Sequence, residues 1–63
     1  MRGSLTAKQS RFVDEYRIDL NGTQAAIRAG YSRKTARSIA KENLTKPDIA
    51  AAVAEAQAAR ARR

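Results

Sequence analysis

The stretch AIRAGYSRKTARSIAK, from Ala26 to Lys41, combines a helical apolar pattern with a central Gly-Tyr-Ser break and an unbalanced charge. It contains five positive side chains and no negative one. Small and apolar residues recur at steps of three and four on both sides of the break, as they do in amphipathic helices. The stretch therefore predicts two short helices joined by a turn, with a basic outer surface.

Several features of this stretch fit a helix-turn-helix motif. Ala26 is small enough for the second helix to cross the first closely. Gly30, four residues later, tolerates the left-handed backbone that ends a helix. Ala36 and Ile39 supply inward side chains on the second helix, and Tyr31 can lay its ring over the junction while its hydroxyl stays at the surface. The sequence therefore predicts a helix-turn-helix.

Capping signals set the expected bounds of these two helices. Asn21, with Gln24 as its capping-box partner, precedes a helix over residues 22–29. Ser32 is the predicted cap of the next helix, over residues 33–44. The side chains predicted to face inward on that helix are Ala36, Ile39, Ala40 and either Asn43 or Leu44.

The chain before this stretch predicts a further helix, over residues 7–19. Thr6 and Gln9 match a capping box at its start. Apolar side chains then recur on one face at helical spacing. They are Leu5, Phe12, Val13, Tyr16 and Leu20.

A fourth helix is predicted over residues 47–61. Pro47 fits the first helical position, and Asp48 places a negative charge at the positive end of the helix dipole. Ile49 and Val53 are its large apolar anchors in an alanine-rich sequence.

These elements predict an all-α fold, a small bundle of about four helices in one helix-turn-helix domain over residues 1–63. Sequence that alternates in the manner of a β-strand is absent. We expect residues 1–4 to be a flexible leader. Because the last helix has no C-cap, we expect residues 47–63 to lead into an oligomerisation domain that this chain lacks.

Composition argues against an enzyme. With no histidine and no cysteine, the 63 residues lack the usual neutral-pH acid-base group, thiolate ligands and disulfides. The few large apolar residues cannot enclose a substrate cavity of about 300 Å³. Asp14 and Glu15 diverge as neighbours on a helix, so we interpret them as solvated, and Phe12 and Tyr16 as core residues. We expect a soluble, intracellular, non-enzymatic protein without metal or cofactor.

Thirteen Lys and Arg against six Asp and Glu give a net charge of +7, which favours a nucleic-acid partner, with an anionic membrane surface second. Two other interpretations stay open. The basic stripe can be an ordinary solvated helix face. Alternatively, the chain is a basic segment that folds only on a membrane or a protein partner.

In a helix-turn-helix, residues near the start of the second helix reach base edges. We predict that Arg33 and Arg37, one helical turn apart, make forked hydrogen bonds to guanine. Lysines and a flanking arginine suit phosphates, and hydroxyl groups can add neutral contacts. The predicted DNA-binding residues are Arg28, Ser32, Arg33, Lys34, Thr35, Arg37, Ser38 and Lys41.

Three motifs follow one another in order: Asn21-x-Thr23-x-Ala25-Ala26, Ala29-Gly30-Tyr31-Ser32 and Leu44-x-Lys46-Pro47. With the sequence around them, from Leu5 to about Gln57, the chain closely resembles the N-terminal DNA-binding domain of tailed-bacteriophage terminase small subunits. A helix-turn-helix transcription regulator is the alternative, although the sequence offers neither an effector pocket nor a dimerisation helix.

The resemblance implies a role in packaging viral genomes in the bacterial host cytoplasm. Small terminase subunits recognise the packaging-initiation site on double-stranded viral DNA, form homo-oligomeric rings, and deliver the DNA to the large subunit with its ATPase and nuclease. Ring formation is expected of the longer protein, and this chain alone is expected to be a monomer. The contact residues that the resemblance implies are Arg33, Lys34, Arg37, Ser38 and Lys41, with Arg28 flanking.

Overall fold

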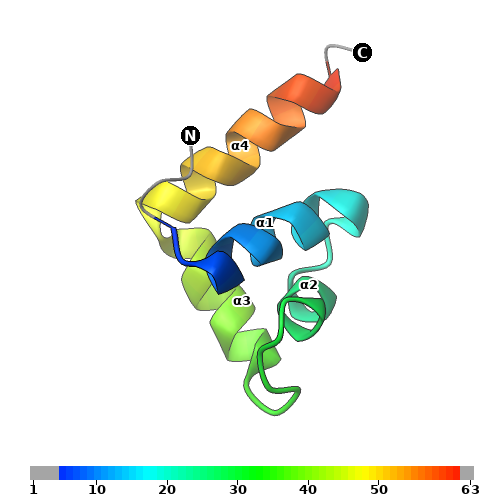
Figure 1. The fold of residues 1–63 in the computed structure, drawn as a ribbon, viewed down its shortest axis with the longest axis vertical. Helices are drawn as coiled ribbons and strands as arrows, with labels where there is room; N and C mark the ends of the chain where they lie inside the picture. The colour runs from blue at the N-terminus through cyan, green and yellow to red at the C-terminus, as the bar shows by residue number, and fades with distance from the viewer. Residues whose placement is uncertain (1–4, 62–63) are drawn as a thin grey trace.

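The computed structural model describes residues 5–61, with side chains as far as residue 58. Within these residues the chain folds into four helices, and the predicted all-α fold is confirmed (Figure 1). α1 packs against α2 and α4, and α3 also packs against α2 and α4. The predicted leader, residues 1–4, lies outside the described residues. The helices are α1 (Ala7–Asp19), α2 (Gly22–Arg28), α3 (Ala36–Thr45) and α4 (Pro47–Ala61).

α1 begins as predicted and ends with an unpredicted backbone conformation. The Gln9 N–H donates to Thr6 Oγ1 at 3.1 Å, and the Thr6 N–H donates to Gln9 Oε1 at 3.0 Å, which completes the capping box. At the other end, Leu20 adopts the left-handed conformation (φ 56°, ψ 28°), and its N–H donates to the Tyr16 carbonyl. The prediction that Leu20 belongs to the apolar stripe is wrong. The left-handed residue turns the chain away from the helix, and Leu20 is 53% exposed.

α2 ends in a Schellman motif, one residue earlier than predicted. Gly30 has a positive φ of 106°, which confirms its predicted left-handed role. The Gly30 N–H donates to the Ile27 carbonyl at 3.1 Å, and the Tyr31 N–H donates to the Ala26 carbonyl at 3.0 Å. These two bonds satisfy carbonyl groups at the end of the helix. The chain therefore turns at Gly30 instead of continuing as one helix.

The start of α2 shows half of its predicted capping box. Asn21 Oδ1 accepts from the Gln24 N–H at 3.1 Å, as predicted. The Asn21 N–H donates to Asp19 Oδ1 at 3.2 Å instead of to the Gln24 side chain. The carboxylate is a strong acceptor within two residues, so it replaces the amide oxygen of the box.

α3 begins at Ala36, three residues later than predicted. Ser32 does not cap this helix: its Oγ accepts from the Lys34 N–H at 3.2 Å, and its carbonyl accepts from the Thr35 N–H at 3.1 Å. These bonds close a tight turn over residues 32–35, a local alternative to helix that serine side chains favour. Thr35 is the observed N-cap, and its side chain makes no capping bond.

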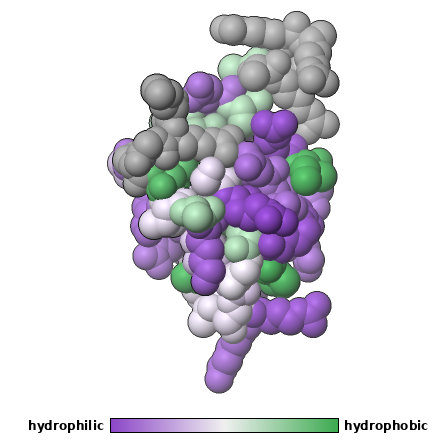
Figure 2. Space-filling model, in the orientation of Figure 1, coloured by the Kyte–Doolittle hydropathy of each residue, from purple (hydrophilic) through white to green (hydrophobic). Residues whose placement is uncertain are grey.

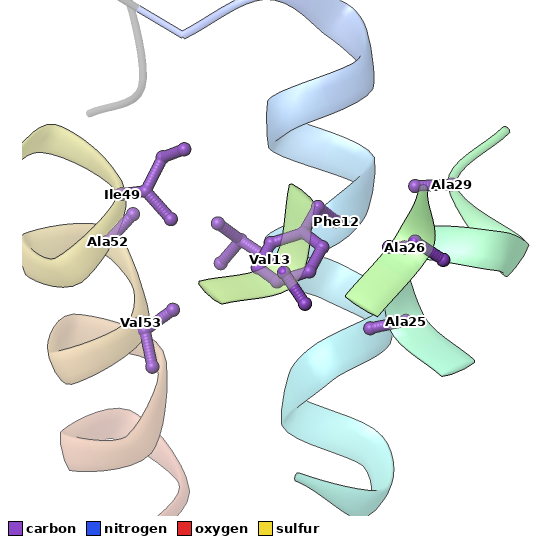
Figure 3. Packing of buried hydrophobic residues seen from close by; sticks show 10 residues of the cluster. Phe12, Val13, Ala25, Ala26, Ala29, Ile49, Ala52 and Val53 are labelled. Atoms are coloured by element: carbon purple, nitrogen blue, oxygen red, sulfur yellow. The ribbon is translucent and has the colours of Figure 1, made fainter. Parts of the chain in front are cut away.

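The core is assembled around two residues of α1. Phe12 and Val13 are fully buried, and they lie between the α4 residues on one side and the alanines of α2 on the other (Figure 3). Ile49 and Val53 of α4 are buried, as predicted. Alanines fill most of the remaining interior: Ala25, Ala26, Ala29, Ala36, Ala40, Ala52 and Ala56.

Small side chains allow the helices to approach closely. A Cβ atom on Gly22 would lie 3.1 Å from the Cβ of Ala40, so the start of α2 sits directly against α3. Asn43 on the same helix is only 3% exposed, and Leu44 is half-buried. Both predicted ends of the inward stripe therefore face the core. This close packing fixes the position of α3 on the rest of the domain.

Candidate nucleic-acid interface

The residues predicted to contact DNA on the turn and on α3 are all exposed. Figure 2 shows long hydrophilic side chains that project from the lower end of the molecule, over the turn between α2 and α3. The outward side of α3 is separated from its inward side, where Ala36 and Ala40 are buried. We call this surface the basic face. It consists of Ser32, Arg33, Lys34, Thr35, Arg37, Ser38 and Lys41.

The cations of the basic face have no acidic partner among the described residues. None of Arg33, Lys34, Arg37 or Lys41 lies within 4.0 Å of a described carboxylate. No ion pair with a described residue therefore neutralises these four charges. A surface of this kind attracts polyanions electrostatically.

The late start of α3 changes the relation between the two arginines. Arg37 lies in the first turn of α3, about one turn nearer the helix start than predicted, because the helix begins at Ala36. Arg33 lies in the preceding turn, so the predicted one-turn spacing along a shared helix face does not apply to this pair. The structure thus places one arginine on the helix and the other in the turn before it.

Arg28, predicted to flank the DNA, is held by acidic groups of α1. Its Nε donates to Glu15 Oε1 at 2.7 Å, and its Nη2 donates to Asp19 Oδ1 at 3.2 Å and to the Glu15 carbonyl at 3.1 Å. Arg11 adds a 3.1 Å ion pair to Glu15 from the preceding turn. The interpretation of Glu15 as a solvated side chain is therefore wrong, because its carboxylate is paired with two arginines and mostly covered. The cluster joins α1 to α2 and sets Arg28 apart from the unpaired cations of the basic face.

The same cluster makes the stability of the domain depend on pH. Hydrogen bonds from Arg28, then from Arg11, hold the pKa of Glu15 below its ordinary value of 4.5. Hydrogen bonds from Arg28, then from the Asn21 backbone, hold the pKa of Asp19 below its ordinary value of 3.8. A lowered folded-state pKa stabilises the fold above the ordinary pKa, and this contribution disappears as the pH falls through the lowered value.

We therefore expect the Tm to fall as the pH is lowered below 4.5, the ordinary pKa of the glutamate. Circular dichroism melts between about pH 7 and pH 2 measure this dependence. Arg28→Gln should flatten it, because both carboxylates lose their main cationic donor. An Arg28→Gln variant with the acid dependence of the unchanged chain would contradict this role of the cluster.

One cation near the basic face was missed by sequence reasoning. The Nζ atom of Lys8, on α1, lies over the ring of Tyr31 at 5.1 Å from its centroid. The ring of Tyr31 is half-buried and packs against the core, in agreement with its predicted place over the junction. No local pattern connects Lys8 with Tyr31, because only the packing of α1 on the α2–α3 turn brings them together.

The described residues offer no other chemical centre. They contain no group of three or more His, Cys, Asp or Glu side chains able to hold a metal ion. A depression of about 380 Å³ lies where α1 and α4 begin. It is near the C-terminal end of α3, whereas Arg37 is near the N-terminal end of that helix. No helix in the described part of the chain is both long and apolar enough to span a membrane. The basic face is thus the surface whose chemistry is most distinctive.

Similarity to known proteins identifies the family. The sequence pattern that defines terminase small subunits matches residues 5–63. The chain belongs to the terminase small subunit family. It is 52% identical, over 56 residues, to the terminase small subunit of Bacillus phage SPP1. The aligned residues cover 87% of this chain and 38% of that protein. No solved structure is significantly similar to the chain.

Two further relatives carry the same family description. The terminase small subunit of Bacillus phage SF6 is 54% identical over 50 residues, which cover 78% of this chain and 34% of that protein. That of Staphylococcus phage 80alpha is 44% identical over 52 residues, which cover 81% of this chain and 36% of that protein. The chain thus spans little more than a third of the length of these terminase small subunits.

Proposed function

We propose that this chain binds double-stranded DNA through the basic face, as the DNA-recognising part of a phage terminase small subunit. In this proposal α2, the turn and α3 act as a helix-turn-helix, with α3 in the major groove. The longer protein recognises the packaging-initiation site of viral DNA in the host cytoplasm. It then delivers this DNA to the large subunit, and the 63-residue chain has no catalytic role.

The observation that carries this proposal is the separation of charge between two parts of the domain. The acids Glu15 and Asp19 are used to hold Arg28, whereas the four cations of the basic face have no described carboxylate beside them. An ordinary solvated surface tends to intersperse both signs of charge. A continuous row of unpaired cations on one helix and its preceding turn instead suits the phosphates that border a groove.

The observed helix start refines the roles within the basic face. Arg37 and Ser38 lie in the first turn of α3, the part of a recognition helix that reaches base edges. We therefore assign base reading to Arg37, whose fork can bond guanine. Arg33, Lys34 and Lys41 are assigned to phosphates. For Arg28 to make the flanking contact with DNA, its guanidinium group must replace one of its ion pairs with Glu15 and Asp19 by an ion pair with a phosphate.

Weak binding by one copy is compatible with the proposed role of the longer protein. Several copies in a homo-oligomeric ring would present several basic faces to one DNA, and linked sites gain avidity without new contacts. α4 leads out of the domain in a direction away from α2 and the turn (Figure 1). It can therefore connect to an assembly domain without covering the basic face.

Fluorescence anisotropy with labelled duplex DNA tests the proposed function. If Arg33, Lys34 and Lys41 each neutralise one phosphate, the slope of log affinity against log salt is about −2.7. Affinity then falls about 40-fold between roughly 50 and 200 mM salt. An absence of duplex binding, or an affinity insensitive to salt, would refute the assignment of phosphates to the basic face.

A further inference from the structure

We propose that Lys8 of α1 is an additional phosphate contact, held beside the basic face by the ring of Tyr31. The inference rests on the proposed DNA binding and extends the contact surface to a third part of the fold. Its starting point is the cation–π contact, in which Lys8 Nζ lies 5.1 Å from the centroid of the Tyr31 ring. Lys8 itself is exposed and lies outside the predicted DNA-binding residues.

The position of the Tyr31 ring is fixed from two sides. Its backbone N–H donates to the Ala26 carbonyl at 3.0 Å, within the Schellman motif. Its ring packs against the buried core and is only partly exposed. An aromatic face held in this way attracts a cation through its quadrupole. The ammonium group of Lys8 is therefore held near the turn, instead of sampling the full range of a free lysine side chain.

Gly30 gives the aliphatic part of Lys8 its place on the turn. A Cβ atom at Gly30 would lie 3.5 Å from Lys8 Cε, which is ordinary contact distance. The lysine stem thus passes over the side of Gly30 that carries no side chain, while the ammonium group reaches the adjacent ring. The contact with Tyr31 and the close approach to Gly30 couple the position of Lys8 to that of the turn.

The distance from this contact to the basic face suits one DNA groove. Tyr31 and Lys34 are three residues apart, so their Cα atoms are separated by at most about 11 Å. The major groove is about 12 Å wide. Lys8 and the cations of the turn can therefore meet phosphates that border the same groove.

Lys8 also has the free charge that a phosphate contact needs. No described carboxylate lies within 4.0 Å of its ammonium group. Arg11, one turn further along α1, differs in this respect because it pairs with Glu15 at 3.1 Å. A cation–π contact leaves the positive charge in place, so Lys8 can bind an anion while it remains over Tyr31.

The alternative is that the Lys8–Tyr31 contact only stabilises the fold. The two roles differ in their salt dependence, because only a phosphate contact releases counterions on DNA binding. Lys8→Gln is the test variant. Lys46→Gln is its control, because it also removes one positive charge. Lys46 follows the end of α3 and pairs with Glu42.

We expect the salt slope of duplex binding to be about −3.6 for the unchanged chain, with Lys8 as a fourth phosphate contact. Lys8→Gln should make the slope less negative by about 0.9, whereas Lys46→Gln should leave it unchanged. The affinity ratio of the unchanged chain to Lys8→Gln should then be about 3.5-fold larger at 50 mM than at 200 mM salt. Tyr31→Phe keeps the ring and should retain the slope of the unchanged chain.

The outcomes separate this inference from the proposed function. The Lys8 contact alone would be overturned if Lys8→Gln and Lys46→Gln had equal salt slopes. In that case the unchanged chain would still bind duplex DNA in a salt-dependent way, and Arg37→Ala would weaken that binding. No duplex binding by the unchanged chain would overturn both. A lower Tm of Lys8→Gln with an unaltered salt slope would assign Lys8 to folding and also overturn the inference.

Discussion

Phe12→Ala is expected to lower the Tm of the domain to room temperature or only slightly above room temperature. Phe12 is fully buried at the centre of the core, and its ring stacks on Tyr16 with centroids 5.8 Å apart. Removal of a buried phenylalanine side chain costs about 3–5 kcal/mol. A domain of this length has a total stability of only about 3–9 kcal/mol. The loss is therefore comparable to the whole free energy of unfolding.

Alanine neighbours cannot compensate for this loss. The residues around Phe12 include Ala25 and Ala26, which have no rotatable groups that could fill the space (Figure 3). Circular dichroism at 222 nm during urea and thermal unfolding measures the effect. Ile18→Ala is the control on the same helix, because Ile18 is 63% exposed and its truncation should change stability by no more than about 0.5 kcal/mol. A Phe12→Ala variant as stable as Ile18→Ala would contradict the central role of this ring.

The double substitution Arg33→Ala and Arg37→Ala is expected to produce the largest loss of DNA affinity. The proposed function gives Arg37 a base contact and Arg33 a phosphate contact. Loss of the phosphate contact should make the salt slope less negative by about 0.9. A forked contact to guanine alone contributes about 1–3 kcal/mol of discrimination. We expect affinity for duplex DNA at low salt to fall by at least about 30-fold, a free-energy change of about 2 kcal/mol.

This loss should occur without loss of the fold. Both arginines are exposed, and neither pairs with a described carboxylate, so the Tm should remain nearly unchanged. A double Arg17→Ala and Lys46→Ala variant provides the control, because it removes the same total charge from positions outside the basic face. If the two double variants bind DNA equally, affinity depends on net charge and the basic face has no special role.

Local signals allowed accurate prediction of the helices whose ends are set by adjacent residues. The capping box of Thr6 and Gln9 fixes the start of α1, and Pro47 with Asp48 marks the start of α4. The prediction for α3 was wrong by three residues, because Ser32 bonds its neighbours in a closed turn. The spacing of Leu20 predicts a place on the apolar face of α1, but its left-handed backbone directs it to solvent.

The candidate site was predictable where exposure follows from helical periodicity and unpredictable where it depends on packing. Arg37 and Lys41 lie off the stripe of buried alanines on α3, and periodicity alone places them outside. The ion pairs of Arg28 and the contact between Lys8 and Tyr31 join segments more than a helical turn apart in sequence. These contacts depend on how α1 lies against α2 and the turn, which single-sequence patterns do not encode.

The alanine interior has a consequence for how DNA preference can change. Ala36 and Ala40 are buried, and Ala40 lies against Gly22, so a larger side chain at position 40 would force α3 away from α2. The outward positions of α3 meet no such restriction. Under the proposed function, new target sequences can be acquired by exchange of outward residues alone, with the architecture that carries them left intact.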